Sequence, residues 1–173
     1  MEHFIRSVRA LSVFFGIVAA ASLVAAILVV CQMVVLRYFL QASTVWQTEF
    51  VTFSIVGATF VGSPYVLLTK GHVNVDLLPL YLSQRIRKVL ALFVSVLAFL
   101  VCVVLAWTGW QYFHEAWAGG WRTDTVWALP LWIPILPLPL GMALLSLQYA
   151  ADICCLITDR EPPFGIQPKE EGE

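Results

Sequence analysis

Residues 11–36, LSVFFGIVAAASLVAAILVVCQMVVL, form an almost unbroken apolar run. A helix needs about twenty apolar residues to cross the hydrocarbon core of a bilayer, and this run is longer than that. Arg6 and Arg9 precede it, and the alanines at 19–21 resemble a signal cleavage site. Because the apolar run continues well past those alanines, we interpret it as a retained membrane anchor. The sequence therefore predicts an integral membrane protein.

The composition of the whole chain supports this interpretation. Its 173 residues are 60% hydrophobic and 12% charged, with a mean hydropathy of +0.84, which excludes an ordinary soluble domain. A net charge of −1 does not favour a nucleic-acid partner. The four cysteines lie in or beside apolar runs without metal-ligand spacing, so we interpret them as buried or lipid-facing thiols. We expect no catalytic residue, no cofactor and no metal site.

The hydropathy pattern predicts an all-α protein with four transmembrane helices. The expected spans are 11–36, 46–69, 84–112 and 131–157, in one domain over 1–158. The polar, proline-rich tail at 159–173 is expected to be disordered. The fourth span begins in a cluster of prolines, each of which removes a backbone hydrogen bond, so a kinked or broken start shielded by protein is predicted. The cluster comprises Pro130, Pro134, Pro137 and Pro139.

The distribution of charge and of tryptophan predicts the orientation. With both termini in the cytoplasm, only Arg37 and Arg122 of the ten Lys and Arg residues lie outside, as the positive-inside rule requires. All seven tryptophans then fall at or beyond outer helix ends, which indicates an aromatic belt together with a packed outer cap or a partner. On one face of the third helix we expect Trp110, Trp117 and Trp121, with Gly119 and Gly120 ending that helix.

The second span carries a polar pattern of its own. Thr44 and Gln47 fit a capping box, which would place Glu49 in the first turns, where the helix dipole favours an anion. Residues at alternating spacings of three and four form one narrow stripe, here called the hydroxyl stripe: Glu49, Thr52, Val56, Thr59 and Ser63. Such a stripe is typical of close approach between membrane helices, and a water-filled pathway is the alternative. We expect no intramembrane acid, base or ion cage within the spans.

Polar residues also gather at 70–88, between the second and third spans. Gly71 is expected to cap the second helix, and 73–82 to form a short interfacial helix on the cytoplasmic side. His72 and Asp76 could together bind a metal or pass a proton, but two ligands without a third favour a structural role. Basic residues then anchor the third helix to the anionic inner surface: Arg85, Arg87 and Lys88.

Three separate blocks, taken in order, resemble the small membrane subunit, the Q type, of tripartite ATP-independent periplasmic (TRAP) transporters. The first block is Arg37, Tyr38, Trp46 and Glu49, similar to the family's Arg-Tyr and Trp-x-x-Glu. The second is Gly71, His72, Val75 and Asp76, similar to Gly-His-x-x-Val-Asp. The third is Pro130, Trp132, Pro139 and Gly141, similar to Pro-x-Trp followed by Pro-x-Gly.

The resemblance implies a non-catalytic subunit of the bacterial inner membrane. It implies tight one-to-one binding to a large elevator-type permease, which would hold the sodium and substrate sites and slide against a fixed scaffold that this chain enlarges. A periplasmic binding protein would dock at the outer face and deliver an organic anion, a carboxylate or a sugar acid. The residues of the three blocks, together with Thr52, Thr59 and Ser63, become candidates for a subunit interface or a structural role.

Two other function classes compete with this interpretation. A haem or quinone enzyme needs histidines within the bilayer or exposed cysteine pairs, whereas His3, His72 and His114 all lie outside the spans. A free-standing small transporter or channel would require a polar pathway, for which the hydroxyl stripe is the one candidate.

Overall fold

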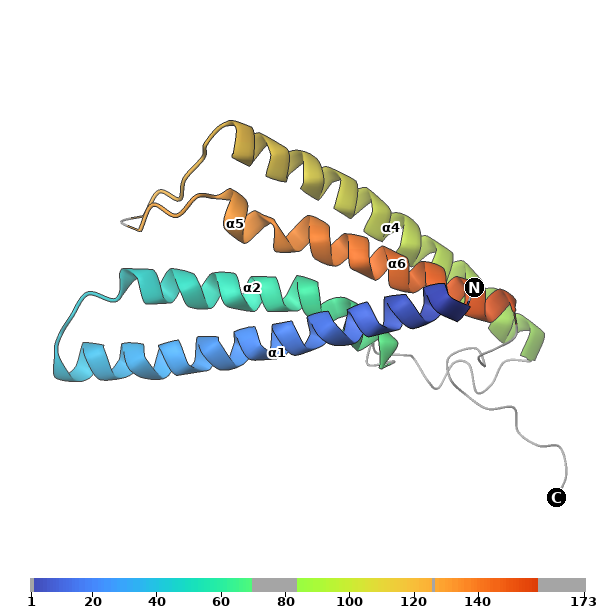
Figure 1. The fold of residues 1–173 in the computed structure, drawn as a ribbon, viewed down its shortest axis with the longest axis horizontal. Helices are drawn as coiled ribbons and strands as arrows, with labels where there is room; N and C mark the ends of the chain where they lie inside the picture. The colour runs from blue at the N-terminus through green and yellow to red at the C-terminus, as the bar shows by residue number, and fades with distance from the viewer. Residues whose placement is uncertain (1, 70–83, 126, 159–173) are drawn as a thin grey trace, which may run out of the picture.

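The computed structural model describes residues 2–69, 84–125 and 127–158, which form helices joined by loops (Figure 1). The helices are α1 (Glu2–Phe39), α2 (Val45–Leu68), α4 (Gln84–Ala118), α5 (Trp132–Ile135) and α6 (Pro137–Ile157). Four helical segments are long and apolar enough to cross a membrane, with α5 and α6 together forming the last. This confirms the expected all-α fold with four spans. Three of the expected features lie outside the described residues. They are the interfacial helix at 73–82, the candidates Gly71, His72 and Asp76, and the tail at 159–173.

The helices lie in a row in the order α1, α2, α6, α4 (Figure 1). The helix α2 packs against α1 on one side and α6 on the other, and α4 packs against α6. The connections at 40–44 and 119–131 lie at one end of the molecule, where the two helix pairs spread apart. Large apolar side chains on α1 and α4 remain exposed, among them Phe14, Ile17, Phe93 and Val104. Such faces suit lipid or another membrane protein.

Helix α4 ends in a glycine motif, as expected at Gly119 and Gly120. The Trp121 amide donates to the Ala116 carbonyl at 3.1 Å, and the Gly120 amide donates to the Trp117 carbonyl at 3.3 Å. Gly120 has a φ of +60°, the left-handed conformation that this motif requires. The helix therefore extends through Ala118, past the expected end of the membrane span at 112.

The start of α2 corrects one prediction. Thr44 is the N-cap residue, but its side chain makes no capping hydrogen bond, and its φ and ψ of −121° and 46° differ from the usual extended cap. The backbone carbonyl of Thr44 accepts a hydrogen bond from Thr48 Oγ1 at 3.1 Å. Gln47, expected to reach back to the cap, is only 2% exposed and is buried against the rest of the chain. The predicted capping box was therefore wrong, although the helix begins directly after Thr44 as expected.

The proline-rich start of the fourth span is broken, as predicted. The four-residue α5 ends before Leu136, and α6 begins at Pro137. The Leu136 amide donates to the Trp132 carbonyl at 3.0 Å, so the chain continues with helical geometry across the break. Pro139 is buried and Pro134 and Pro137 are half-buried, so protein shields much of this irregular segment from lipid.

Helix α6 carries the largest buried stripe. Its buried residues recur at helical spacing: Pro139, Gly141, Leu145, Gln148, Ala151 and Cys155. At Gly141 the α6 backbone lies against the backbone of Phe60 with no room for a Cβ atom. On the other side of α2, a Cβ atom on Gly62 would lie 3.1 Å from Ala19 of α1. Small residues thus let α2 approach both neighbours closely.

Candidate functional site

The hydroxyl stripe lies on the open surface of α2. Thr52, Val56 and Thr59 are exposed, and Ser63 is half-buried. Other residues of α2 meet the neighbouring helices: Thr48 Oγ1 lies 3.6 Å from Met33 Sδ of α1, and Gly57 faces Pro137 of α6. Among the described residues, the row of helices therefore leaves this face of α2 uncovered.

The hydroxyl groups of the stripe bond to their own helix. Oγ1 of Thr52 donates to the Thr48 carbonyl at 2.9 Å, and Oγ1 of Thr59 donates to the Ile55 carbonyl at 2.8 Å. Ser63 Oγ donates to the Phe60 carbonyl at 2.8 Å. With its donors satisfied internally, the stripe offers a narrow surface of small side chains, which suits close packing of another helix.

Glu49, at the loop end of this stripe, has a carboxylate that is buried without a hydrogen-bond donor among the described residues. Both carboxylate oxygens are inaccessible to solvent, and no hydrogen-bond donor reaches either of them within the described chain. The residue lines a polar cavity of about 730 Å³ between the end of α1 and the start of α2. Arg37 lines the same cavity, yet it donates no hydrogen bond to this carboxylate. A buried carboxylate without a donor is unfavourable, so this one marks a place where a further group is needed.

The other candidates of the first block occupy different surroundings. Arg37 and Tyr38 are exposed at the end of α1, where the Tyr38 ring meets the Phe39 ring edge-on at 5.2 Å. The Trp46 ring lies 6.3 Å from that of Trp127, which connects the start of α2 to the loop at 119–131. Arg37 and Glu49 therefore line one cavity, whereas the Trp46 ring lies against Trp127.

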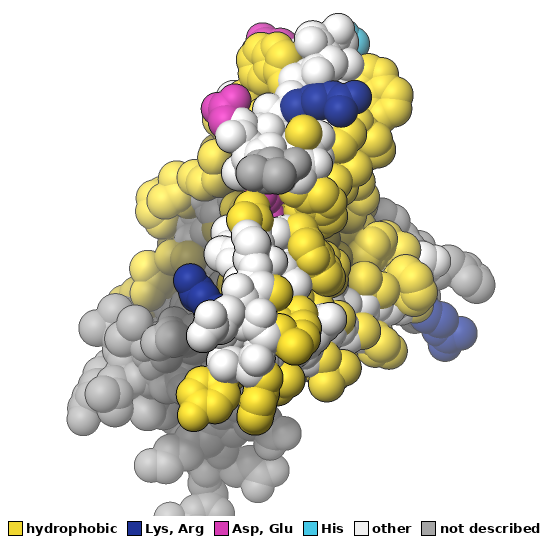
Figure 2. Space-filling model, turned by 90° about the vertical axis from the view of Figure 1, so that its left-hand side faces the viewer, with side chains coloured by type: hydrophobic (Ala, Val, Ile, Leu, Met, Phe, Trp, Pro, Cys, Tyr) yellow, Lys and Arg dark blue, Asp and Glu magenta, His cyan; other side chains and the backbone are white. Residues whose placement is uncertain are grey.

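The third block stabilises the start of the fourth span. The Trp132 ring lies 4.7 Å from the Trp117 ring of α4, in an edge-on arrangement. Pro130 pairs with Arg122 in an isolated antiparallel bridge, and the Leu131 amide donates to the Trp121 carbonyl at 2.9 Å. Figure 2 looks onto this end, where hydrophobic side chains dominate and charged groups are scattered. Pro139 and Gly141, by contrast, are buried between helices.

Sequence analysis missed a buried polar chain that joins α1 to α6. Ser12 Oγ donates to Gln148 Oε1 at 3.0 Å, and Gln148 Nε2 donates to Asp152 Oδ1 at 3.1 Å. Asp152 belongs to the candidate span Trp132–Ile157, so the expectation of spans without an acid was wrong. The i,i+4 spacing of Gln148 and Asp152 was the available signal. These residues hold helices together, because each bond is satisfied within the chain.

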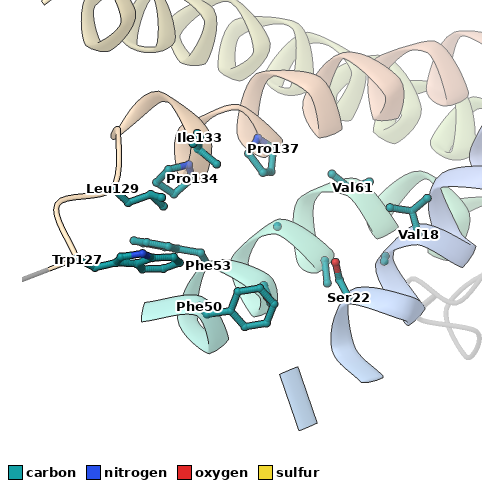
Figure 3. Close-up of a pocket in the computed structure, with 14 residues that line it drawn as sticks. Val18, Ser22, Phe50, Phe53, Val61, Trp127, Leu129, Ile133, Pro134 and Pro137 are labelled. Atoms are coloured by element: carbon teal, nitrogen blue, oxygen red, sulfur yellow. The ribbon is translucent and has the colours of Figure 1, made fainter. Parts of the chain in front are cut away.

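An apolar groove of about 440 Å³ lies between α1, α2 and the broken start of the fourth span (Figure 3). Phe53, Val61 and Pro137 are among its lining residues, and it shares no residue with the hydroxyl stripe. Ser22 and Ser54 bring hydroxyl groups to its lining. No group of three His, Cys, Asp or Glu side chains that could hold a metal gathers in the described ranges.

The structure describes only part of the basic segment at the start of α4. Residues 85 and 87 belong to α4, but the side chains of Arg85 and Arg87 lie outside the description. Lys88 is half-buried in the first turns of the same helix and takes part in an interaction.

Comparison with known proteins identifies similar sequences. The family "Tripartite ATP-independent periplasmic transporters, DctQ component" matches residues 26–159, which include α2 and α4 to α6. The C4-dicarboxylate TRAP transporter small permease protein DctQ of Vibrio cholerae serotype O1 is 26% identical over 151 residues. That match covers 73% of this chain and 64% of the relative, so the chain spans just under two thirds of the relative's length.

Proposed function

Because the chain belongs to the DctQ-component family of tripartite ATP-independent periplasmic transporters, we propose that it is the scaffold subunit that binds and anchors the large permease. The family is a transporter component, and the four spans make this chain a multi-pass membrane protein. Its role is to enlarge the fixed part of the transporter, against which the mobile part of the large permease moves.

The observation that carries this proposal is the open face of α2. A narrow strip of small side chains, with hydroxyl groups already bonded to their own helix, is left exposed in the middle of a hydrophobic row. In lipid, helices associate through close van der Waals packing of such small residues. We assign this face, with Thr52, Thr59 and Ser63, to the contact with a helix of the large permease.

The remaining parts of the proposed transporter follow from the family. The large permease holds the sodium and substrate sites, and the substrate is an organic anion, a carboxylate or a sugar acid. A periplasmic binding protein docks at the end that carries 40–44 and 119–131, where Trp46, Trp127 and Trp132 lie. Both termini face the cytoplasm, and the basic residues Arg85, Arg87 and Lys88 serve as membrane anchors at the inner end.

Co-expression with the cognate large permease tests the proposal. We expect a stable one-to-one complex after affinity purification through a tag on this chain, and uptake in proteoliposomes that requires both subunits and the binding protein. The alternative is a free-standing small transporter or channel. Uptake by this chain alone, or a chain that never retains the large permease, would overturn the scaffold role.

Photo-cross-linking tests the assigned face separately. A benzophenone amino acid placed at Thr52 or Thr59 should cross-link to the large permease. The same group at Phe93, an exposed position on α4, is the control and should give a much lower yield. Equal yields from both helices would show that the open face of α2 is not the preferred contact.

A further inference from the structure

We propose that Glu49 accepts an ion pair from an arginine of the large permease, and that this pair sets the register in which the two subunits pack. The inference rests on the proposed function, since it names the group that meets one end of the hydroxyl stripe. It goes further by assigning a specific polar contact to an interface that is otherwise formed by small and apolar side chains.

The donors nearest to Glu49 in the helix are already engaged. Oγ1 of Thr48 donates to the Thr44 carbonyl, and Oγ1 of Thr52 donates to the Thr48 carbonyl. Neither hydroxyl group bonds to the carboxylate, whose two oxygens are without a donor in the described chain. The helix itself therefore leaves Glu49 unsatisfied.

Arg37 is the basic residue that lines the same cavity. It is exposed at the end of α1 and gives no hydrogen bond to Glu49. An arginine within reach would normally form a short, paired contact with a carboxylate, because such pairs are strong and geometrically matched. The arrangement in this chain thus leaves both oxygens without a donor, and a donor from outside reaches them once the Glu49 side chain turns toward the open face of the stripe.

An arginine is the donor that best fits the Glu49 carboxylate. Both carboxylate oxygens lack a partner, and a planar guanidinium can satisfy two oxygens at once through parallel N–H groups. Lysine offers a single point charge and is more strongly hydrated, so it suits a buried, two-oxygen acceptor less well. Glu49 lies on the same stripe as Thr52 and Thr59, so a helix packed along that stripe would bring such a side chain to it.

Gln47 is not part of this site. Its Oε1 atom is also buried without a donor, but residues two apart on a helix point in different directions. Because of that geometry, one donor from a helix packed on the stripe reaches Glu49 and not Gln47.

The test compares the chain alone with the complex. Since Glu49 has no partner within the described chain, Glu49→Gln should leave the melting temperature of the isolated subunit unchanged or higher. In the complex it should lower the melting temperature and weaken association on the order of tenfold or more, because it removes one half of a buried pair. Glu49→Arg should abolish association. The matched controls are Glu115→Gln and Glu115→Arg at an exposed glutamate of α4. They should change neither the melting temperature nor the association with the permease.

Charge reversal identifies the partner. Each arginine near the outer ends of the permease helices is replaced in turn by glutamate, and each variant is combined with Glu49→Arg. We expect one replacement to restore the complex. If Glu49→Gln and Glu49→Arg bind the permease as the unaltered chain does, or if no replacement restores binding, this inference fails while the scaffold role stands. If the unaltered chain fails to bind the permease, the proposed function fails first.

Discussion

Ser12 and Gln148 join the first and last spans through one hydrogen bond, from Ser12 Oγ to Gln148 Oε1 at 3.0 Å. The two side chains are 2% and 1% exposed, so both are removed from lipid and water. The other end of the amide donates to Asp152. Because α1 otherwise packs mainly against α2, this contact ties the end of the row back to α6.

The Ser12 contact should therefore contribute measurably to stability. We expect Ser12→Ala to lower the free energy of unfolding by about 1 kcal/mol, the usual scale of hydrogen bonds between membrane helices. Gln148→Leu should cost more, about 1–3 kcal/mol, because it removes the buried donor to Asp152 as well. Thermal or denaturant unfolding in detergent measures both. Ser146→Ala is the matched control, since that hydroxyl group donates to the Ala143 carbonyl of its own helix; a loss equal to that of Ser12→Ala would contradict the prediction.

Gly141 offers a second test of helix packing. A methyl group there would collide with the backbone of Phe60, which cannot move without shifting α2. We expect Gly141→Ala to destabilise the subunit by about 1–3 kcal/mol, as overpacked cores do. Gly57→Ala is the control, because its new Cβ atom would lie 3.5 Å from Pro137, an ordinary contact distance. Unfolding of the two variants in the same detergent decides the matter, and equal stability would show that α2 and α6 pack differently.

Two residues with positive φ near helix ends should change stability in opposite directions, because one variant removes a glycine and the other introduces one. Gly120 has a φ of +60° with open space around it, so Gly120→Ala should lower stability by about 1 kcal/mol through backbone strain alone. Gln41, after α1, has a φ of +47°, so Gln41→Gly should relieve strain of about the same size. Changes of the same sign in unfolding measurements on both variants would contradict this account.

The sequence predicted the helices well, and for a physical reason. Backbone amide and carbonyl groups in lipid must form hydrogen bonds within their own segment. A long apolar run such as 11–36 therefore forms a helix. The broken start of the fourth span followed equally directly from prolines that lack an amide hydrogen. Both predictions depend on local chemistry alone.

Tertiary contacts were beyond such reasoning. The order α1, α2, α6, α4 depends on which surfaces meet, and no local pattern specifies it. Thr44 and Gln47 fit a capping box locally, but the Thr44 side chain makes no capping hydrogen bond and Gln47 is buried. Ser12 and Gln148 each looked like a tolerated polar residue, and only the fold shows that they pair. For Glu49 the sequence pattern assigned the residue to the hydroxyl stripe but gave no sign of its missing donor.

The aromatic contact between Trp117 and Trp132 gives the last prediction. Their rings lie 4.7 Å apart and Trp132 also meets Phe113 at 6.4 Å, which fixes the start of the fourth span against the end of α4. Trp132→Leu should remove about 0.5–1.5 kcal/mol beyond the loss of buried area. The adjoining loop should loosen too, because the Thr123 amide donates to Leu129 and the Leu131 amide to Trp121 within it.

Hydrogen exchange measures this loosening. Faster exchange at the amides of Thr123 and Leu131 is expected in Trp132→Leu, while amides in the middle of α4 keep their protection. Trp107→Leu is the matched control, since that side chain is 65% exposed and contributes no ring contact to this cluster. If Trp107→Leu speeds exchange at 119–131 as much as Trp132→Leu does, the loop is held by general lipid contact and not by the ring pair.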